Sequence, residues 1–287
     1  MATGGGSPDP MASAERRAAL ARARSAHETS SAERHDLLAE QATTEVSKGV
    51  HLRMAAVHRS TAACHLAAAR LHEGYAIRLA GWAEAKSTPR PLFMTGVAAA
   101  CGTKSAALTL VGATFDQLSL AASDEQSRAA QELEFLLGEG PAQDATSQAR
   151  AVSAVGSALA DRWPGYGPAV TELGIEEVAA VPLRMSGTCV GALTVFDPAP
   201  RLADSDIFAE VAEVLTRTMI LNPDGDPELY GGTDLRALVH QAAGMTSVQL
   251  DCPVADALEL IKARAFAEST SAHSVSERIL RGELRLG

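Results

Sequence analysis

The sequence predicts an α+β protein: a long N-terminal helix, a domain built on a mainly antiparallel sheet, and a C-terminal three-helix bundle. Three observations predict this arrangement. Residues 11–88 are rich in Ala, with Arg and Glu interspersed, and contain no Pro. Apolar and polar residues alternate in several short segments between 105 and 196. From Leu235 onward, apolar residues recur at steps of three and four, as on one face of a helix.

Composition places the chain among globular cytoplasmic proteins. The 287 residues are 46% hydrophobic and 21% charged, which excludes a disordered polymer. The sequence has no apolar run of about eighteen residues, so we expect no membrane partner. Residues 1–10 are rich in Gly, Ser and Pro and lack the pattern of a signal peptide, so we expect a disordered leader. The four Cys are isolated and show neither a disulfide nor a metal-ligand spacing.

Residues 11–88 are expected to form a coiled-coil-like helix. A seven-residue repeat begins at each of His51, His58, His65 and His72. Read as heptads, the repeat places one set of residues on an apolar seam: Met54, Val57, Thr61, Cys64, Ala68, Leu71, Tyr75 and Trp82. This seam fits either a second copy of the chain or the face of the middle domain, and the sequence leaves both open.

The four His of the repeat are expected beside that seam, as polar residues at the rim of a helix interface. Four titratable rings along an interface also suggest a pH switch. Successive rings lie about 10 Å apart along one helix, so they do not chelate one ion within that helix. The sequence therefore predicts no metal site.

Residues 89–222 read as a domain with a mainly antiparallel sheet. Strands are predicted at 105–111 and 117–121, and a helix at 125–137. Two further strands, 178–185 and 188–196, flank the two-residue turn Ser186-Gly187 and form a hairpin. Asp204 is expected to cap a last helix that buries one apolar face: Ile207, Phe208, Val211, Leu215 and Met219.

Several short motifs lie in this segment: Gly138-Glu-Gly-Pro141 with Asp144-Ala145, Arg162-Trp163-Pro164, Gly174-Ile175, Val181-Pro182-Leu183 and Gly191-Ala-Leu193. Through them the segment resembles the GAF domain. GAF domains bind cyclic nucleotides, haem, other small molecules or nothing, so the resemblance implies a sensor domain without naming a ligand or cofactor. Trp163 and Tyr166 are the candidate ligand-binding residues, and a place in the core is their alternative role.

Residues 223–232 are predicted to be a linker, and residues 233–287 a bundle of three helices. The first helix starts at Thr233 or Asp234 and has an apolar face that includes Leu235, Leu238, Ala242 and Met245. The second opens at Pro253 and buries Val254, Ala257, Leu258, Ile261 and Ala265. Ser274, followed three residues later by Glu277, is expected to cap the third.

Several spaced motifs mark this last segment: Val239-His-Gln-Ala-Ala-Gly-Met245, Ala257-Leu258, Ile261-Lys262 and Ala265-Phe266. In these positions it is similar to the ANTAR domain, an RNA-binding module of bacterial antitermination regulators. The resemblance implies binding of stem-loop RNA in nascent transcripts through Gln241, Ala242, Gly244 and Lys262. Arg264, Arg278 and Arg281 are added as RNA-binding candidates on charge alone. Ala243 and Thr270 depart from the family at positions where its members often carry a basic residue.

Charge restricts where RNA can bind. The net charge is −10 overall, but residues 91–230 carry seven basic and nineteen acidic side chains, whereas residues 231–287 carry six and seven. The acidic middle repels phosphate, so the C-terminal module or the N-terminal helix must make any contact. We expect RNA and not DNA as the partner, and a homodimer that presents two modules to one transcript.

No sequence motif of an enzyme is present, so no catalytic residues are predicted. The competing interpretation is a GAF-based, signal-sensing scaffold whose C-terminal bundle mediates only protein association.

Overall fold

A computed structural model of the chain describes residues 9–85, 90–113, 116–185, 187–199, 206–217 and 234–287. It combines helices with a five-stranded antiparallel sheet, which confirms the predicted α+β class. The chain divides into two compact units, Met1–Gly96 with Glu213–Pro223, and Val97–Ala212 with Asp224–Gly287. Residues 1–8 of the predicted leader and the whole predicted linker 223–232 lie outside the described residues. None of the helices described is both long enough and apolar enough to cross a membrane.

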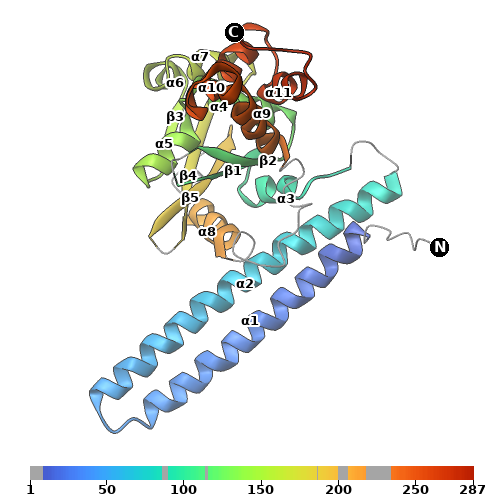
Figure 1. The fold of residues 1–287 in the computed structure, drawn as a ribbon. Helices are drawn as coiled ribbons and strands as arrows, with labels where there is room; N and C mark the ends of the chain where they lie inside the picture. Colours follow the sequence, from blue (N-terminus) through green and yellow to red (C-terminus); the bar gives the residue numbers. More distant parts are fainter. Residues whose placement is uncertain (1–8, 86–89, 114–115, 186, 200–205, 218–233) are drawn as a thin grey trace, which may run out of the picture. The chain divides into compact units, whose positions relative to one another are not determined.

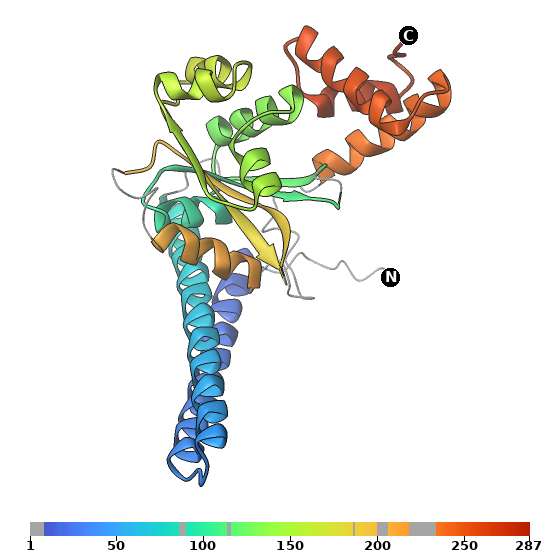
Figure 2. The same cartoon turned by 90° about the vertical axis from the view of Figure 1, so that its left-hand side faces the viewer.

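The first unit contains a pair of long helices, α1 (Pro10–Glu40) and α2 (Glu45–Ala85), which lie side by side in Figures 1 and 2. The predicted long helical segment over 11–88 is thus helical, but it consists of two long helices and not of one. The chain turns between the two helices, where the Thr44 hydroxyl accepts a hydrogen bond from the Ser47 N–H at 3.2 Å and so caps the second helix. At the other end, the Asp9 carboxylate accepts from the Met11 N–H and starts α1 at Pro10.

Small side chains hold the two helices together. The buried Ala residues follow heptad spacing on both helices: Ala14, Ala18, Ala21, Ala32 and Ala39 on α1, and Ala55, Ala62, Ala69 and Ala76 on α2. The Ser25 hydroxyl donates to the Ala62 carbonyl at 2.9 Å across this interface. The predicted seam fails at its start, because Met54 and Val57 are 40% and 55% exposed.

The predicted seam is correct further along α2, where Cys64, Ala68, Leu71 and Tyr75 are buried. The sequence pattern favoured the larger apolar residues over the whole length of the helix. The contact with α1 uses Ala instead, since a small side chain lets two helices approach closely.

His51 and His58 lie at the α1–α2 contact and stay partly exposed, as expected for residues at its rim, whereas His72 is buried. His51 Nδ1 lies 3.0 Å from His35 Nδ1 of α1, and His58 Nδ1 lies 2.7 Å from Glu28 Oε2. The His35 ring stacks on His58 with centroids 5.3 Å apart and planes 18° apart. The second helix thus places His35 between two rings that are one heptad apart on α2.

Lowering the pH from 7.5 to 5.5 is expected to open the α1–α2 hairpin. Burial lowers the pKa of His35 below 6.5, and the like charges of His51, His58 and Arg34 lower it further, while Asp36 acts in the opposite direction. The unfolded chain therefore binds more protons below about pH 6.5, so stability is lost as the pH falls. Hydrogen exchange of α1 and α2 peptides should show opening that increases as the pH falls from 7.5 to 5.5.

His35→Gln should remove most of this pH dependence, because His51 and His58 then lack the ring between them. His27→Gln is the matched control on the same helix, since His27 is exposed. Both variants retain the contact between His58 and Glu28. An identical pH response in His35→Gln and in the wild type would contradict the prediction.

The sheet of the second unit has the strand order β2-β1-β5-β4-β3. Its strands are β1 (Ser105–Val111), β2 (Gln117–Ala122), β3 (Val152–Val155), β4 (Glu177–Met185) and β5 (Thr188–Phe196). Every neighbouring pair is antiparallel. The predicted hairpin is confirmed, because Met185 pairs with Thr188 at its end and Val178 with Phe196 at its base.

Helices pack around this sheet. They are α4 (Glu125–Leu137), α5 (Pro141–Gln148), α6 (Ser157–Arg162) and α7 (Tyr166–Glu172) (Figure 1). The buried side chains form a main apolar core and a smaller cluster under α5. The main core combines Ala107, Leu120 and Phe196 of the sheet with Trp163 and Tyr166. Gly138 ends α4 in the left-handed conformation with φ 68°, which explains the predicted break there.

Helices α3 (Phe93–Ala100) and α8 (Asp206–Leu215) complete residues 90–217. Phe208 and Leu215 of α8 are buried as predicted. Ile207 is 50% exposed, which corrects its predicted inward position. The predicted cap Asp204 and the inward Met219 lie outside the described residues.

The C-terminal segment forms α9 (Asp234–Leu250), α10 (Val254–Ala267) and α11 (Ala272–Leu280). Their shared core consists of Val239, Ala242, Ala243, Ala257, Ile261, Ala265, Ala272, Val275 and Ile279. Two expectations need correction. Val254 is 51% exposed because it occupies the first turn of α10, and the cap of α11 is Ser271, whose hydroxyl accepts from the Ser274 N–H at 3.1 Å.

Candidate functional site

The three-helix bundle packs against α4 and strand β2, at one edge of the sheet (Figures 1 and 2). Hydrogen bonds contribute to this contact. His240 Nε2 of α9 lies 3.1 Å from the Gln117 carbonyl of β2, and the Ala272 N–H donates to Glu132 Oε1 of α4 at 2.8 Å. Ala272 belongs to the core of the bundle, so its attachment to α4 restrains the three helices together.

Arg236 of α9 is the most deeply buried charge in this contact. Its side chain is 1% exposed, its Nη2 lies 2.9 Å from Glu132 Oε2, and its guanidinium carbon stands 3.8 Å above the Phe135 ring. Burial lowers the pKa of Arg236, and Glu132 opposes this effect. Glu132 therefore supplies the counter-charge that lets a guanidinium enter an apolar contact.

Lys262, a predicted RNA-binding residue, also lies in this contact. Its ammonium is 4.8 Å from the Phe135 ring centroid and 2.8 Å from Glu259 Oε1, and its side chain is 13% exposed. The Phe135 ring thus faces two cations of the bundle, Arg236 and Lys262. The docked arrangement covers Lys262 and leaves it little surface for another partner.

The other predicted RNA-binding residues are distributed over the bundle. Gln241 is exposed on α9, whereas Ala242 is fully buried in the core, so its side chain contributes to packing and not to a surface. Arg278 and Arg264 both pair with Glu268, at 2.5 and 2.6 Å. Arg278 is the main reason that the pKa of Glu268 lies below its usual range.

Arg281 pairs with Glu277 at 3.3 Å and is 60% exposed. Each predicted cation therefore already has a carboxylate partner within the bundle. Arg264 and Arg278 are brought together at Glu268, while Lys262 faces Phe135.

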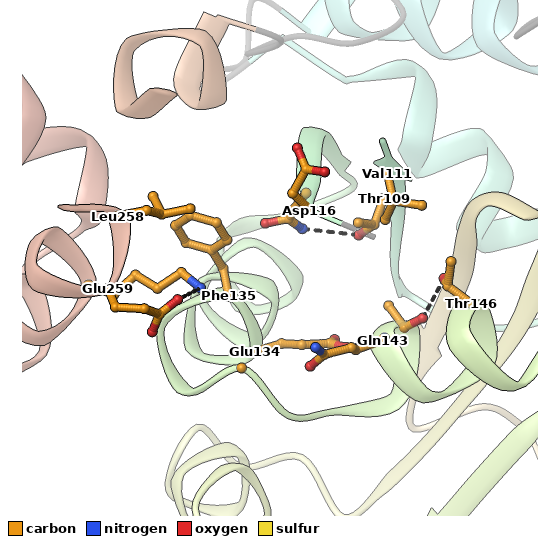
Figure 3. A pocket seen from close by; sticks show the side chains of 13 residues that line it. Thr109, Val111, Asp116, Glu134, Phe135, Gln143, Thr146, Leu258 and Glu259 are labelled. Carbon is orange, nitrogen blue, oxygen red and sulfur yellow. Dashed lines mark hydrogen bonds and ion pairs between the residues drawn. The ribbon is translucent and has the colours of Figure 1, made fainter. Parts of the chain in front are cut away.

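A cavity of about 260 Å³ opens beside Phe135, between the sheet domain and α10 (Figure 3). Its sheet-domain side includes Thr109, Asp116, Gln117, Glu134, Gln143 and Thr146, and its α10 side Leu258, Glu259 and Lys262. Three carboxylates and one ammonium face it. The cavity belongs to both parts of the contact, so a molecule bound there would contact the sheet domain and the bundle together.

Glu134 is a fully buried carboxyl group at this cavity. Burial raises its pKa to about 7, against hydrogen bonds from the Gln143 N–H at 2.6 Å and from Gln131 Nε2 at 2.8 Å. Gln131 accepts in turn from the Thr109 hydroxyl. The group therefore changes its protonation state near neutral pH, at the wall of a cavity.

Raising the pH from 4.5 to 8 is expected to destabilise the fold through Glu134. Its pKa is about 7 in the folded chain and 4.5 as an ordinary carboxyl, so the folded chain binds more protons between these values and loses stability as the pH rises. The loss is about 3 kcal/mol for one such group. Urea denaturation at pH 5, 6, 7 and 8 measures it.

Glu134→Gln should flatten this profile, because the amide keeps an acceptor for the Gln143 N–H and never ionises. Glu125→Gln is the control on the same helix, since the Glu125 side chain is 93% exposed. If the stability of the Glu134→Gln variant varied with pH as that of the wild type does, burial of the Glu134 carboxyl would not be the cause of the pH dependence.

Trp163 and Tyr166, the predicted ligand-binding residues, lie in the core of the sheet domain. They are 2% and 0% exposed, their rings meet edge-to-face with centroids 6.0 Å apart, and neither lines the cavity at Phe135. Burial raises the pKa of Tyr166 well above its usual value. The structure thus places both residues in the core, which was the alternative to ligand binding.

Sequence reasoning missed Glu132, Glu134 and Phe135 of α4. A signal existed, because Gln131 and Glu134 fall on the face of the predicted helix 125–137 that also carries Ala130 and Phe135. Polar residues on the apolar face of a helix are unusual and mark a polar network or a site.

Within the described ranges, no group of three or more His, Cys, Asp or Glu side chains is placed to hold a metal ion. No protein-family model, curated protein or solved structure matches the chain.

Proposed function

We propose that this chain is a cytoplasmic regulator that binds stem-loop RNA in nascent transcripts and so causes transcription antitermination. The RNA-binding module is the ANTAR-like bundle of α9 to α11, and the GAF-like sheet domain controls it. Support comes from the apolar core that α9, α10 and α11 share, which also takes in Phe135 of α4, and from an open surface on α9 that includes Gln241 and Gly244.

The observation that carries the proposal is Gly244. It lies in the middle of α9, has no positive φ, and a Cβ added there would meet nothing within 4 Å in the described part of the chain beyond its own helical turn. Gly in such a position destabilises a helix by roughly 0.5–1 kcal/mol relative to Ala. The fold gains nothing from the missing side chain. RNA binding would gain from it, because a backbone or base of the RNA could approach the helix closely.

Control is proposed to act through the docking of the bundle. In the docked state Lys262 lies on Phe135, while the surface at Gln241 and Gly244 stays open. RNA then meets an incomplete set of contacts until the bundle separates from α4. Any signal that weakens the docking therefore raises RNA affinity, by shifting the population toward the free module.

Dimerisation is proposed to present two bundles to one transcript. Three apolar residues are exposed at successive heptad positions of α2: Val50, Met54 and Val57. A second copy of the chain could cover them. Two linked modules bind a two-loop RNA with a higher apparent affinity than either alone.

A salt titration tests the proposal. Full-length chain is titrated with a two-loop RNA and with the same RNA with its loops paired, between 50 and 200 mM salt. Engagement of Lys262, Arg264, Arg278 and Arg281 predicts that log K falls against log salt with a slope of about −3. A flat curve, or equal binding of both RNAs, would contradict RNA reading by the bundle.

Protein association through the bundle is the second candidate function. The observation that favours it is the pairing of all four predicted cations with Glu259, Glu268 or Glu277, which leaves little net positive charge. It predicts that the bundle retains a protein partner and that RNA binding is absent even at low salt.

A further inference from the structure

A second cavity, of about 670 Å³, lies between α4 and the bundle, on the other side of Phe135's helix from Glu134. Its walls are mainly apolar and come from both parts: Leu120, Leu133, Leu136 and Leu173 of the sheet domain, and Ala265 and Phe266 of α10. Its volume falls in the range of small-molecule sites, about 300–1,000 Å³. Phe266 is 56% exposed although it is one of only six Phe in the chain.

The polar side chains of this cavity are gathered on α4 and at the start of α11. Glu132 is already satisfied, because it pairs with Arg236 and accepts from the Ala272 N–H. Within the described part of the chain, the ion pair of Arg128 is a distant one with Glu125, at 3.8 Å, and Glu125 is 93% exposed. Arg128 therefore keeps donors available for an anion in the cavity.

His273 provides a second group. Its Nδ1 is buried and has no hydrogen-bond partner among the described residues, while its Nε2 is 3.5 Å from Glu277. A buried ring nitrogen without a partner is costly, so a ligand that supplied one would be stabilised there. In the tautomer that carries its proton on Nδ1, the ring donates a hydrogen bond from that nitrogen.

We propose that this cavity is a binding site for a small amphipathic carboxylate. Its apolar tail lies against Leu133, Leu136 and Phe266, and its carboxylate accepts hydrogen bonds from Arg128 and His273. Glu125 also lines the cavity, but its side chain is 93% exposed and stays in solvent, and the charge of Glu132 is balanced by Arg236. A neutral sugar does not fit these features, since it would leave the apolar leucine wall without an apolar partner.

The ligand would act on the docking of the bundle. Since the cavity has one wall on the sheet domain and one on the bundle, a molecule that fills it binds the docked state and not the separated one. By linkage, the bound carboxylate lowers the affinity of the chain for RNA, and bound RNA lowers the affinity for the carboxylate by the same factor. This consequence rests on the proposed function, whereas carboxylate binding itself does not.

The experiment measures binding of decanoate and 1-decanol to the full-length chain by calorimetry, below the critical micelle concentration and without RNA. Decanoate should bind at least about tenfold more tightly than the alcohol, as expected for charge-assisted hydrogen bonds to a carboxylate. Arg128→Gln should remove this preference while the alcohol still binds. Equal binding of acid and alcohol to the wild type would overturn the proposal.

Ala129→Phe tests the place of binding, because Ala129 lines the cavity and is only half-buried, so a larger side chain can fill the space. It should abolish binding of both compounds. Ala263→Phe, at an exposed position of α10 away from the cavity, is the matched control and should bind decanoate normally. Undiminished binding of decanoate by Ala129→Phe would overturn the proposal. A failure of the chain to bind RNA would contradict the proposed function and not the carboxylate site.

Discussion

Replacing Glu132 with Ala will destabilise the docked bundle by about 3–5 kcal/mol, the usual cost of leaving a buried charge without its partner. Arg236 is 1% exposed and would keep its charge above the Phe135 ring with no carboxylate beside it. The Ala272 N–H would lose its acceptor in the same variant. Native-state hydrogen exchange of α9 measures the docking, and urea denaturation measures the whole fold.

Arg236→Met should cost less than half as much. The thioether chain packs on Phe135, and Glu132 remains 21% exposed and hydrated. The double variant should be more stable than Glu132→Ala alone, which gives a coupling energy for the pair. Glu125→Ala, at an exposed position of the same helix, is the control and should change stability by less than about 0.5 kcal/mol. Equal effects of Glu132→Ala and Arg236→Met would contradict this account of the contact.

The proposed control adds a functional expectation for Glu132→Ala. A bundle released from α4 exposes Lys262, so the variant should bind the two-loop RNA more tightly than the wild type does.

Gly244→Glu should lower RNA affinity at least about a hundredfold while the chain stays folded. The added side chain meets open space within the protein, but it would place bulk and negative charge where the RNA approaches. Gly244→Ala separates stability from function. It should stabilise the helix by roughly 0.5–1 kcal/mol and still weaken RNA binding about tenfold. Thermal unfolding and an RNA shift titration measure the two effects.

Gly81→Ala provides the matched control. Gly81 is also within a helix and also has open space at its Cβ position, but it lies on α2, outside the bundle. It should gain similar stability and leave RNA binding unchanged. If Gly244→Ala and Gly244→Glu bound RNA as the wild type does, the open surface of α9 would not be the RNA contact.

The elements that the sequence predicts best are those defined by local patterns. The hairpin of β4 and β5 follows from two alternating segments around one short turn, and α10 follows from Pro253 and the spacing of Ala257 and Ile261. Such signals need no knowledge of the rest of the fold.

The pairing within residues 11–88 was harder to predict, because both faces of α2 carry a heptad pattern. Apolar size favoured Met54 and Val57, whereas the structure uses Ala55 and Ala62 against α1. A short turn at Thr44, without Gly or Pro, left no strong sequence signal for the break between the helices.

The contact of the bundle with α4 could not be predicted from sequence. Lys262 and Phe135 are far apart in the chain, and nothing local indicates that a cation of α10 lies on an aromatic ring of α4. For the same reason, Ala242 was predicted to contact RNA, whereas the structure buries it in the bundle core together with Val275 and Ile279. Tertiary contacts decide which side of a helix is available to a partner.

The most direct test of RNA reading by the bundle is the affinity of full-length chain for a two-loop RNA after Lys262→Glu and Arg278→Glu are combined. The control combines Arg24→Glu and Arg53→Glu, which make the same change in net charge at exposed positions of the hairpin. The account predicts that the first protein loses at least about a hundredfold in affinity and that the second stays within about threefold of the wild type. Unchanged RNA binding by the first protein would contradict it.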